Sequence, residues 1–219
     1  MKTTFERFAG YYAILAGLAG FLYAIAFILL KSNLLSALFL LLGGFFASAA
    51  ILAVYQRVRA TEQTFALWAV LFALAGAFGS IVHAGYDLSN AIHPPAAINA
   101  DLPSPIDPRG LAAFGFAGVG LFVFSWLILR SHKFPSSFAW LGTLSAVLML
   151  VLYLARLVIL DATNPVVVIP ALLEGFIVNP IWYIWLGALL LRRQPAKALE
   201  TGRMERTTPQ SGGLWRKLP

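Results

Sequence analysis

Polar and small residues recur at steps of three and four along the apolar segment 65–90, which places them on one face of a helix. They are Gly76, Ser80, His83, Asp87 and Asn90. Imidazole and carboxylate groups can bind a ligand, transfer a proton or coordinate a metal. Polar and ionisable side chains are costly against lipid, so we expect this stripe to point into a helix bundle.

Two later segments carry further polar residues. At 1.5 Å per residue, Arg156 lies about 27 Å from the start of segment 138–160, the same depth as His83 in its own segment. Segment 166–191 has Glu174, expected near its outer end, and Asn179 before Pro180, whose missing N–H leaves a backbone carbonyl without its helical partner. The candidate ligand-binding residues are His83, Asp87, Tyr153, Arg156, Glu174 and Asn179.

The same residues also fit purely structural contacts. Arg156 would then pair with Glu174 or Asp161, and His83 would hydrogen-bond to Asp87 or Ser80. The expected interfacial depth favours this alternative, because polar groups cost little there. The depth of Glu174 depends on whether its helix begins behind an Asn164 cap or only at Pro170.

A metal site would recruit His83 and Asp87, which share a helix face, together with His93 from the following loop. The pattern is short, and it leaves both the metal and any cofactor unknown. The chain has no cysteine, which excludes thiolate ligands, disulfides and cysteine nucleophiles. Neither a G-x-S-x-G motif nor a phosphate-binding loop is present, so no catalytic residue is assigned.

The elements that position these residues follow from composition. The chain has 219 residues, of which 60% are apolar and 11% charged, far from the balance of a soluble domain. A bilayer core about 30 Å thick needs roughly 20 apolar residues per helix, and continuous apolar runs exclude a β-barrel. We predict an all-α bundle of six transmembrane helices over 8–30, 34–55, 65–90, 111–130, 138–160 and 166–191.

Charge predicts how the helices are threaded. Most of the 16 Lys and Arg residues fall on the side of the two termini, so the positive-inside rule predicts that both termini are cytoplasmic. The net charge of +7 is then a topology signal and does not indicate nucleic-acid binding. A transmembrane domain over 1–191 precedes a basic cytoplasmic tail over 192–219, which we expect to contact anionic lipid headgroups.

Small residues at four-residue spacing allow helices to approach closely. They are Ala16, Gly20 and Ala24, then Ala69, Ala73 and Ala77, then Ala113 and Ala117. Packing within the chain explains these stripes, and a homodimer face is the alternative.

Short motifs recur over the fourth to sixth spans. The basic turn Arg130–Lys133 leads into Phe134 and Pro135, then Trp140-Leu141-Gly142, and the last span has Glu174 followed by Trp185-Leu186-Gly187. In these features the chain resembles a family of uncharacterised bacterial six-helix membrane proteins known only as a domain of unknown function. The likeness covers under half of the chain. It implies six helices and a bacterial cytoplasmic (inner) membrane, and it brings no activity or site residue.

The sequence thus predicts a non-enzymatic integral membrane protein, acting as a structural or accessory subunit or as a partner-binding module. The alternative is an outward-facing small-molecule binding protein or transporter with a polar pocket at the outer ends of the third, fifth and sixth helices. A metal-assisted membrane hydrolase comes third. Transport predicts polar groups running through the bundle, whereas the inner halves of the third, fifth and sixth spans are almost entirely apolar.

Overall fold

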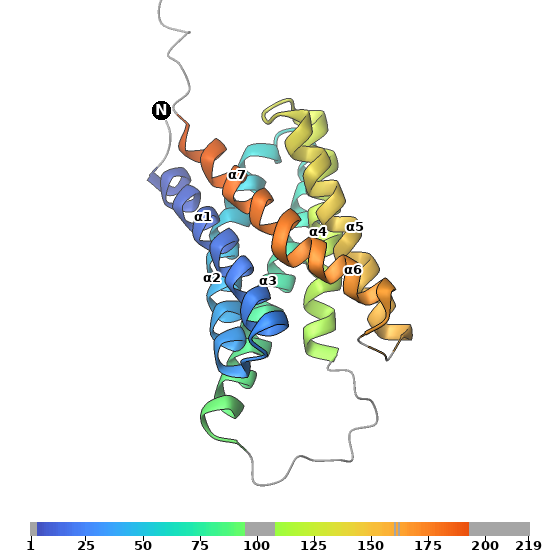
Figure 1. The fold of residues 1–219 in the computed structure, drawn as a ribbon. Coiled ribbons are helices and arrows are strands. Elements are labelled where there is room, and N and C mark those ends of the chain that lie inside the picture. The colour runs from blue at the N-terminus through green and yellow to red at the C-terminus, as the bar shows by residue number, and fades with distance from the viewer. Residues whose placement is uncertain (1–3, 95–107, 160, 162, 193–219) are drawn as a thin grey trace, which may run out of the picture.

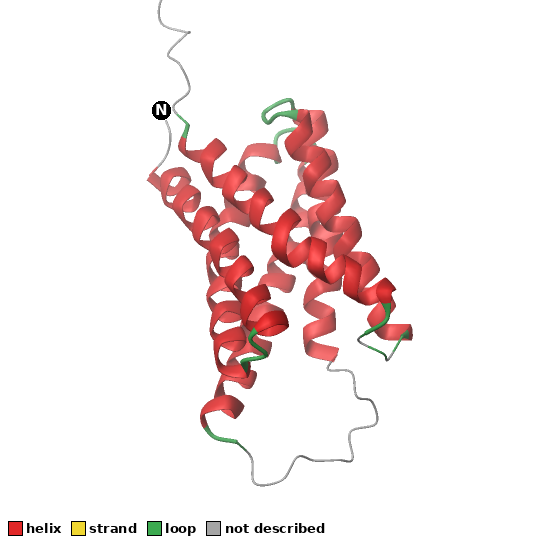
Figure 2. Cartoon of the chain, viewed as in Figure 1, coloured by secondary structure: helices red, strands yellow, loops and turns green. Residues whose placement is uncertain are grey.

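The computed structural model describes residues 4–94, 108–159, 161 and 163–192. Within these ranges every regular element is helical (Figure 2). Six helices are long and apolar enough to cross a membrane, which confirms the predicted all-α bundle and makes the chain a multi-pass membrane protein. Their outward side chains are largely apolar, as contact with lipid requires.

The spans are built as follows. The first joins α1 (Thr4–Ala24) to a π-helical turn, η1 (Ile25–Leu29), and the next four are α2 (Asn33–Val58), α3 (Gln63–Ile92), α4 (Pro108–Ser131) and α5 (Ser136–Val158). The sixth combines α6 (Pro165–Leu173), a second π-helical turn, η2 (Glu174–Val178), and α7 (Asn179–Leu191).

The six spans form a closed ring. Each helix packs against the next along the chain, and α7 returns to pack against α1 (Figure 1). Thr4 and Leu191 lie at the same end, which we call the terminal end. The opposite end, with the α1–α2 turn and the first residue of α6, is the distal end. The distal end corresponds to the predicted outer side, although its orientation in a membrane stays a prediction.

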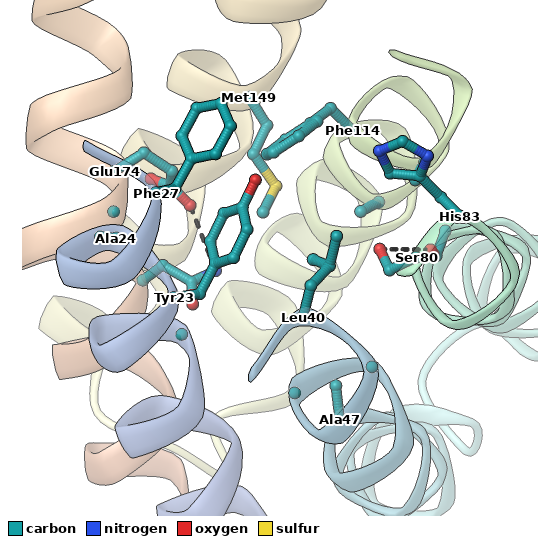
Figure 3. Close-up of a pocket in the computed structure, with 18 of the residues that line it drawn as sticks. Tyr23, Ala24, Phe27, Leu40, Ala47, Ser80, His83, Phe114, Met149 and Glu174 are labelled. Atoms are coloured by element: carbon teal, nitrogen blue, oxygen red, sulfur yellow. Dashed lines mark hydrogen bonds between the residues drawn. The ribbon is translucent and has the colours of Figure 1, made fainter. Parts of the chain in front are cut away.

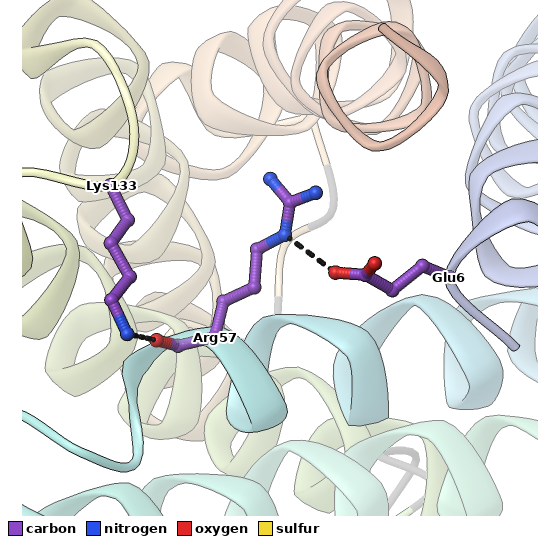
Figure 4. Close-up of polar contacts among 3 residues, drawn as sticks. All are labelled: Glu6, Arg57 and Lys133. Atoms are coloured by element: carbon purple, nitrogen blue, oxygen red, sulfur yellow. Dashed lines mark hydrogen bonds and ion pairs between the residues drawn. The ribbon is translucent and has the colours of Figure 1, made fainter. Parts of the chain in front are cut away.

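Polar contacts tie the terminal end together (Figure 4). Arg57 of α2 pairs with Glu6 of α1, with 3.1 Å between Nε and Oε1. The backbone carbonyl of Arg57 accepts a hydrogen bond from Lys133 Nζ at 2.7 Å. The Arg57 guanidinium also lies 5.2 Å from the centre of the Phe134 ring. One arginine therefore connects α1, α2 and the turn between α4 and α5.

Small residues bring the helix backbones together inside the ring. A Cβ added at Gly120 would lie 2.6 Å from Ala73 N, and one added at Gly76 would lie 2.7 Å from Ala117 N. A Cβ at Gly175 would lie 3.0 Å from Ala24 Cβ. Ala73, Ala117 and Ala24, which belong to the predicted small-residue stripes, thus serve packing within the chain. A homodimer face stays a prediction.

The sixth span begins where Asn164 caps it, not at Pro170. The Asn164 side chain accepts a hydrogen bond from Val166 N at 3.0 Å, and Pro165 occupies the first turn, where no N–H is needed. Further along, Pro180 has no N–H to continue the ladder. The turn η2 precedes it, with Asn179 N–H bonded to Glu174 O, five residues back. The Asn164 cap, Pro165 and Pro180 together therefore determine where Glu174 lies along the sixth span.

Candidate functional site

The ring encloses a cavity of about 1270 Å³. On α2 its lining runs from Asn33 to Val54, about 31 Å along the helix at 1.5 Å per residue. Among its lining residues, Val54 and Trp182 are buried, whereas Phe27 and Tyr86, nearer the distal end, are exposed. The cavity therefore extends along most of α2, and its lining is more buried toward the terminal end.

All six candidate residues line this one cavity: His83, Asp87, Tyr153, Arg156, Glu174 and Asn179. They occupy different walls. Figure 3 shows Glu174 and His83 on opposite sides, with Leu40, Phe114 and Met149 around the space between them. The structure thus gathers the candidates around an apolar chamber and does not bring them into one compact cluster. Their role in binding stays a prediction.

Glu174 is the most buried of the candidates, at 3% exposure. Its Oε1 accepts a hydrogen bond from Ser145 Oγ at 2.6 Å and one from Asn179 Nδ2 at 3.3 Å. Its Oε2 is buried and has no hydrogen-bond partner among the residues that the structure describes. One oxygen is therefore held by the protein, whereas the other is buried without a partner within these ranges.

Two expectations about Glu174 are corrected. The pair with Arg156, one of the two pairings offered for that residue, does not occur within the described ranges: Oε1 accepts from Ser145 and Asn179, and Oε2 has no partner there. Glu174 is also deeper than expected: counted from Pro165 it lies well inside its 27-residue span, and Ser145 lies near the middle of α5. At that depth a carboxyl group is costly, so the argument from interfacial position fails for Glu174.

The stripe on α3 matches the structural alternative in one contact. His83 Nε2 lies 3.3 Å from Asp87 Oδ2, one helical turn away. Ser80 donates to its own helix, to Gly76 O at 3.0 Å. Arg156 lies near the distal end, where its positive charge reaches Asp161. The exposed loop side chain of Asp161 accepts hydrogen bonds from Thr163, which lowers its pKa below the usual 3.8.

No group of three potential metal ligands occurs among the described residues. His93 does not line the cavity that His83 and Asp87 share. The three residues suggested by the sequence therefore do not assemble as a metal site within the described ranges.

Sequence patterns did not single out Ser145. A lone serine in an apolar span usually returns its hydroxyl to a carbonyl of its own helix, as Ser80 does, so its type and position carry no signal. Aromatic lining residues were missed for a similar reason, because tyrosine, tryptophan and phenylalanine are spread through every span. Those lining the cavity include Tyr23, Phe27, Phe114, Trp182 and Tyr183.

The chain matches no protein-family model, no curated protein and no solved structure. The resemblance to the uncharacterised six-helix family accordingly stays a prediction, and the functional argument rests on the geometry.

Proposed function

We propose that the chain is a multi-pass membrane protein that binds a mainly apolar small molecule inside its ring of helices. The observation that supports this proposal is the cavity of about 1270 Å³, whose lining is largely apolar with polar groups on opposite walls. Ligand sites in proteins are typically concave, mainly apolar and about 300–1,000 Å³, with a few polar groups that orient the ligand. Protein interiors otherwise contain few voids larger than a water molecule.

The geometry thereby favours the binding alternative over the accessory-subunit role that the sequence suggested first. An accessory subunit needs a partner surface, and the exposed apolar side chains are spread over all six spans, as lipid contact alone requires. No localised apolar patch among the described residues points to a partner protein. Nothing in the described residues favours a reaction either, so the proposed role is binding without catalysis.

Cavity filling tests the proposal. Ala47 is buried on α2 and lines the cavity, so Ala47→Phe places a ring inside it. Leu52 lies on the same helix, is exposed and does not line the cavity, so Leu52→Phe is a matched control. The probe is the fluorescent apolar dye N-phenylnaphthylamine, added to protein in lipid nanodiscs.

We expect saturable binding of the dye to the wild type and to Leu52→Phe, with at least about a tenfold loss in Ala47→Phe. Equal binding by all three proteins would show that the dye reports only lipid and would refute the proposal. Melting temperatures of the variants establish that each is folded.

We also propose that the terminal end faces the cytoplasm of a bacterial cell, across its inner membrane. Basic residues support this orientation: Arg7, Arg57, Arg59, Arg130, Lys133 and Arg192 lie at the terminal end, against Lys31, Arg109 and Arg156 toward the distal end. Anionic headgroups would contact this end and the basic tail, whose residues 193–219 lie outside the described ranges.

Single-cysteine labelling tests the orientation, because the chain has no native cysteine. Ser131→Cys is at the terminal end and Thr163→Cys is at the distal end. A membrane-impermeant maleimide should label Thr163→Cys in intact cells and Ser131→Cys only after permeabilisation. The reverse pattern would contradict the proposed orientation.

A further inference from the structure

We propose that Glu174 anchors a lipophilic amine, whose ammonium group lies against Oε2 while its apolar chain fills the cavity. This inference rests on the proposed binding function and specifies the chemistry of the ligand. It follows from the hydrogen bonding of the carboxyl group, the charges around it, the aromatic lining and the shape of the cavity.

The carboxyl group leaves one oxygen available. Ser145 and Asn179 both donate to Oε1, whereas Oε2 is buried without a partner among the described residues. Both protein donors therefore lie at the same oxygen of the carboxyl group. A buried carboxylate that has no cation beside it is strongly disfavoured, and a positively charged ligand removes that penalty.

The basic residues of the lining have acidic groups close to them. His83 pairs with Asp87 across 3.3 Å, and the charge of Arg156 reaches Asp161. No lysine, arginine or histidine hydrogen-bonds to or pairs with Glu174 within the described ranges. The wall around Glu174 is thus the part of the cavity that selects a positive charge.

Aromatic rings accompany the carboxyl group. Figure 3 shows Tyr23 and Phe27 beside Glu174 at the same wall, and Trp182 and Tyr183 line the cavity from the helix that follows η2. The face of an aromatic ring attracts ammonium groups, most strongly where water is excluded. A carboxylate flanked by rings favours an alkylammonium over a hydrated metal ion, which would need several oxygen ligands.

The part of the cavity toward the terminal end fits an apolar chain. From Glu174 the lining continues through Ala47, Ile51 and Val54 on α2, with Leu121 and Phe124 on α4. None of these five side chains offers a hydrogen bond. A ligand that placed a polar group there would lose its hydration without compensation. The ammonium group therefore belongs at Glu174, and the hydrocarbon chain belongs against these five apolar residues.

Two probes with the same chain separate charge from apolar fit. N,N-dimethyldodecylamine is protonated at neutral pH and carries an N–H donor, whereas N,N-dimethyldodecanamide is neutral and has no donor. Binding of each is measured by titration calorimetry on protein in nanodiscs of one zwitterionic lipid. The variant Glu174→Gln keeps an acceptor for Ser145 and Asn179, and Glu62→Gln removes an exposed carboxylate at the terminal end as a control.

We expect the wild type and Glu62→Gln to prefer the amine on the order of tenfold, and Glu174→Gln to bind both probes with the affinity of the amide. A preference that survives in Glu174→Gln, or equal affinities in the wild type, would overturn the inference while leaving apolar binding intact. If neither probe binds the wild type better than Ala47→Phe, the proposed function itself fails.

A second measurement covers the case in which Glu174→Gln does not fold. Dicyclohexylcarbodiimide is apolar and adds to carboxyl groups reached from a membrane. On the wild-type protein, mass spectrometry of peptides should find the adduct on Glu174, with the amine protecting it and the amide not. Equal protection by both probes, or no adduct on Glu174, would contradict the assignment.

Discussion

Ser145 Oγ donates to Glu174 Oε1 at 2.6 Å, joining α5 to η2 inside the ring of helices. Both residues are buried. The bond fixes the carboxyl group so that its other oxygen is the one without a partner in the described part of the chain. A single interhelical contact thereby determines how the cavity presents its most buried acidic group.

Removal of this bond should destabilise the fold. We predict that Ser145→Ala lowers the free energy of unfolding by about 1–2 kcal/mol, because a buried carboxyl group loses a donor. Thr143→Ala on the same helix removes a bond only to the helix's own carbonyl, Ala139 O, and should change it by less than about 0.5 kcal/mol. Unfolding in SDS titrations measures both. Equal losses would show that the interhelical bond contributes nothing specific.

Close packing at Gly142 gives a second prediction. A Cβ there would lie 2.5 Å from Ser125 Oγ and 2.7 Å from Trp182 Nε1, so Gly142→Ala should lower the free energy of unfolding by about 1–3 kcal/mol. A Cβ at Gly85 meets nothing within 4 Å, which makes Gly85→Ala the control. Gly85→Ala should be neutral or slightly stabilising in the same titration. A harmless Gly142→Ala would contradict the observed packing.

The terminal-end ion pairs should differ in strength. A double-mutant cycle on Glu6 and Arg57, whose side chains are 19% and 15% exposed, should give a coupling energy of about 1 kcal/mol. The longer pair between Arg130 and Glu62, which are 53% and 48% exposed, should give less than about 0.5 kcal/mol. Changing each residue to Ala, singly and together, measures both values. The reverse order would show that burial does not decide these couplings.

The direction of the pKa shift of Asp161 determines how its contact with Thr163 depends on pH. The Thr163 hydroxyl and then its backbone N–H hold the pKa of Asp161 below 3.8, and the charge of Arg156 acts in the same direction. The resulting stabilisation is present above pH 3.8 and disappears as the pH falls through the lowered pKa of the folded state. Asp161→Asn should therefore melt at a lower temperature near neutral pH and converge with the wild type by about pH 2. A difference that persists at that pH would exclude an effect of charge.

The sequence predicted the features that depend on long runs or regular spacing of residues, and it missed those that depend on local contacts. Apolar runs predicted six helices because each span must satisfy its backbone internally. The stripe on α3 offered Asp87 or Ser80 as the partner of His83, since residues three and four apart on a helix are neighbours, and the contact with Asp87 is the one observed. The depth of Glu174 was misjudged although the helix begins at Pro165, one residue from the predicted start, because nine positions into the span already correspond to about 13 Å at 1.5 Å per residue. Its surroundings also depend on a π-helical turn, which has no periodic signal.

The cavity itself could not be predicted, because it depends on how six helices close into a ring. The partner of Glu174 was missed for the same reason: Ser145 is distant in sequence and meets it only through the packing of α5 on the sixth span. Sequence patterns identified most of the polar lining residues, but the contacts they make required the tertiary structure.

Occupancy of the cavity is the most direct test of the proposed function. Native mass spectrometry of the wild type, Ala47→Phe and Leu52→Phe, each released from native membranes in mild detergent, would detect a bound small molecule. We predict a stoichiometric apolar adduct on the wild type and on Leu52→Phe, and its loss from a folded Ala47→Phe. An adduct retained equally by Ala47→Phe, or no adduct together with no binding of added apolar probes, would contradict the account.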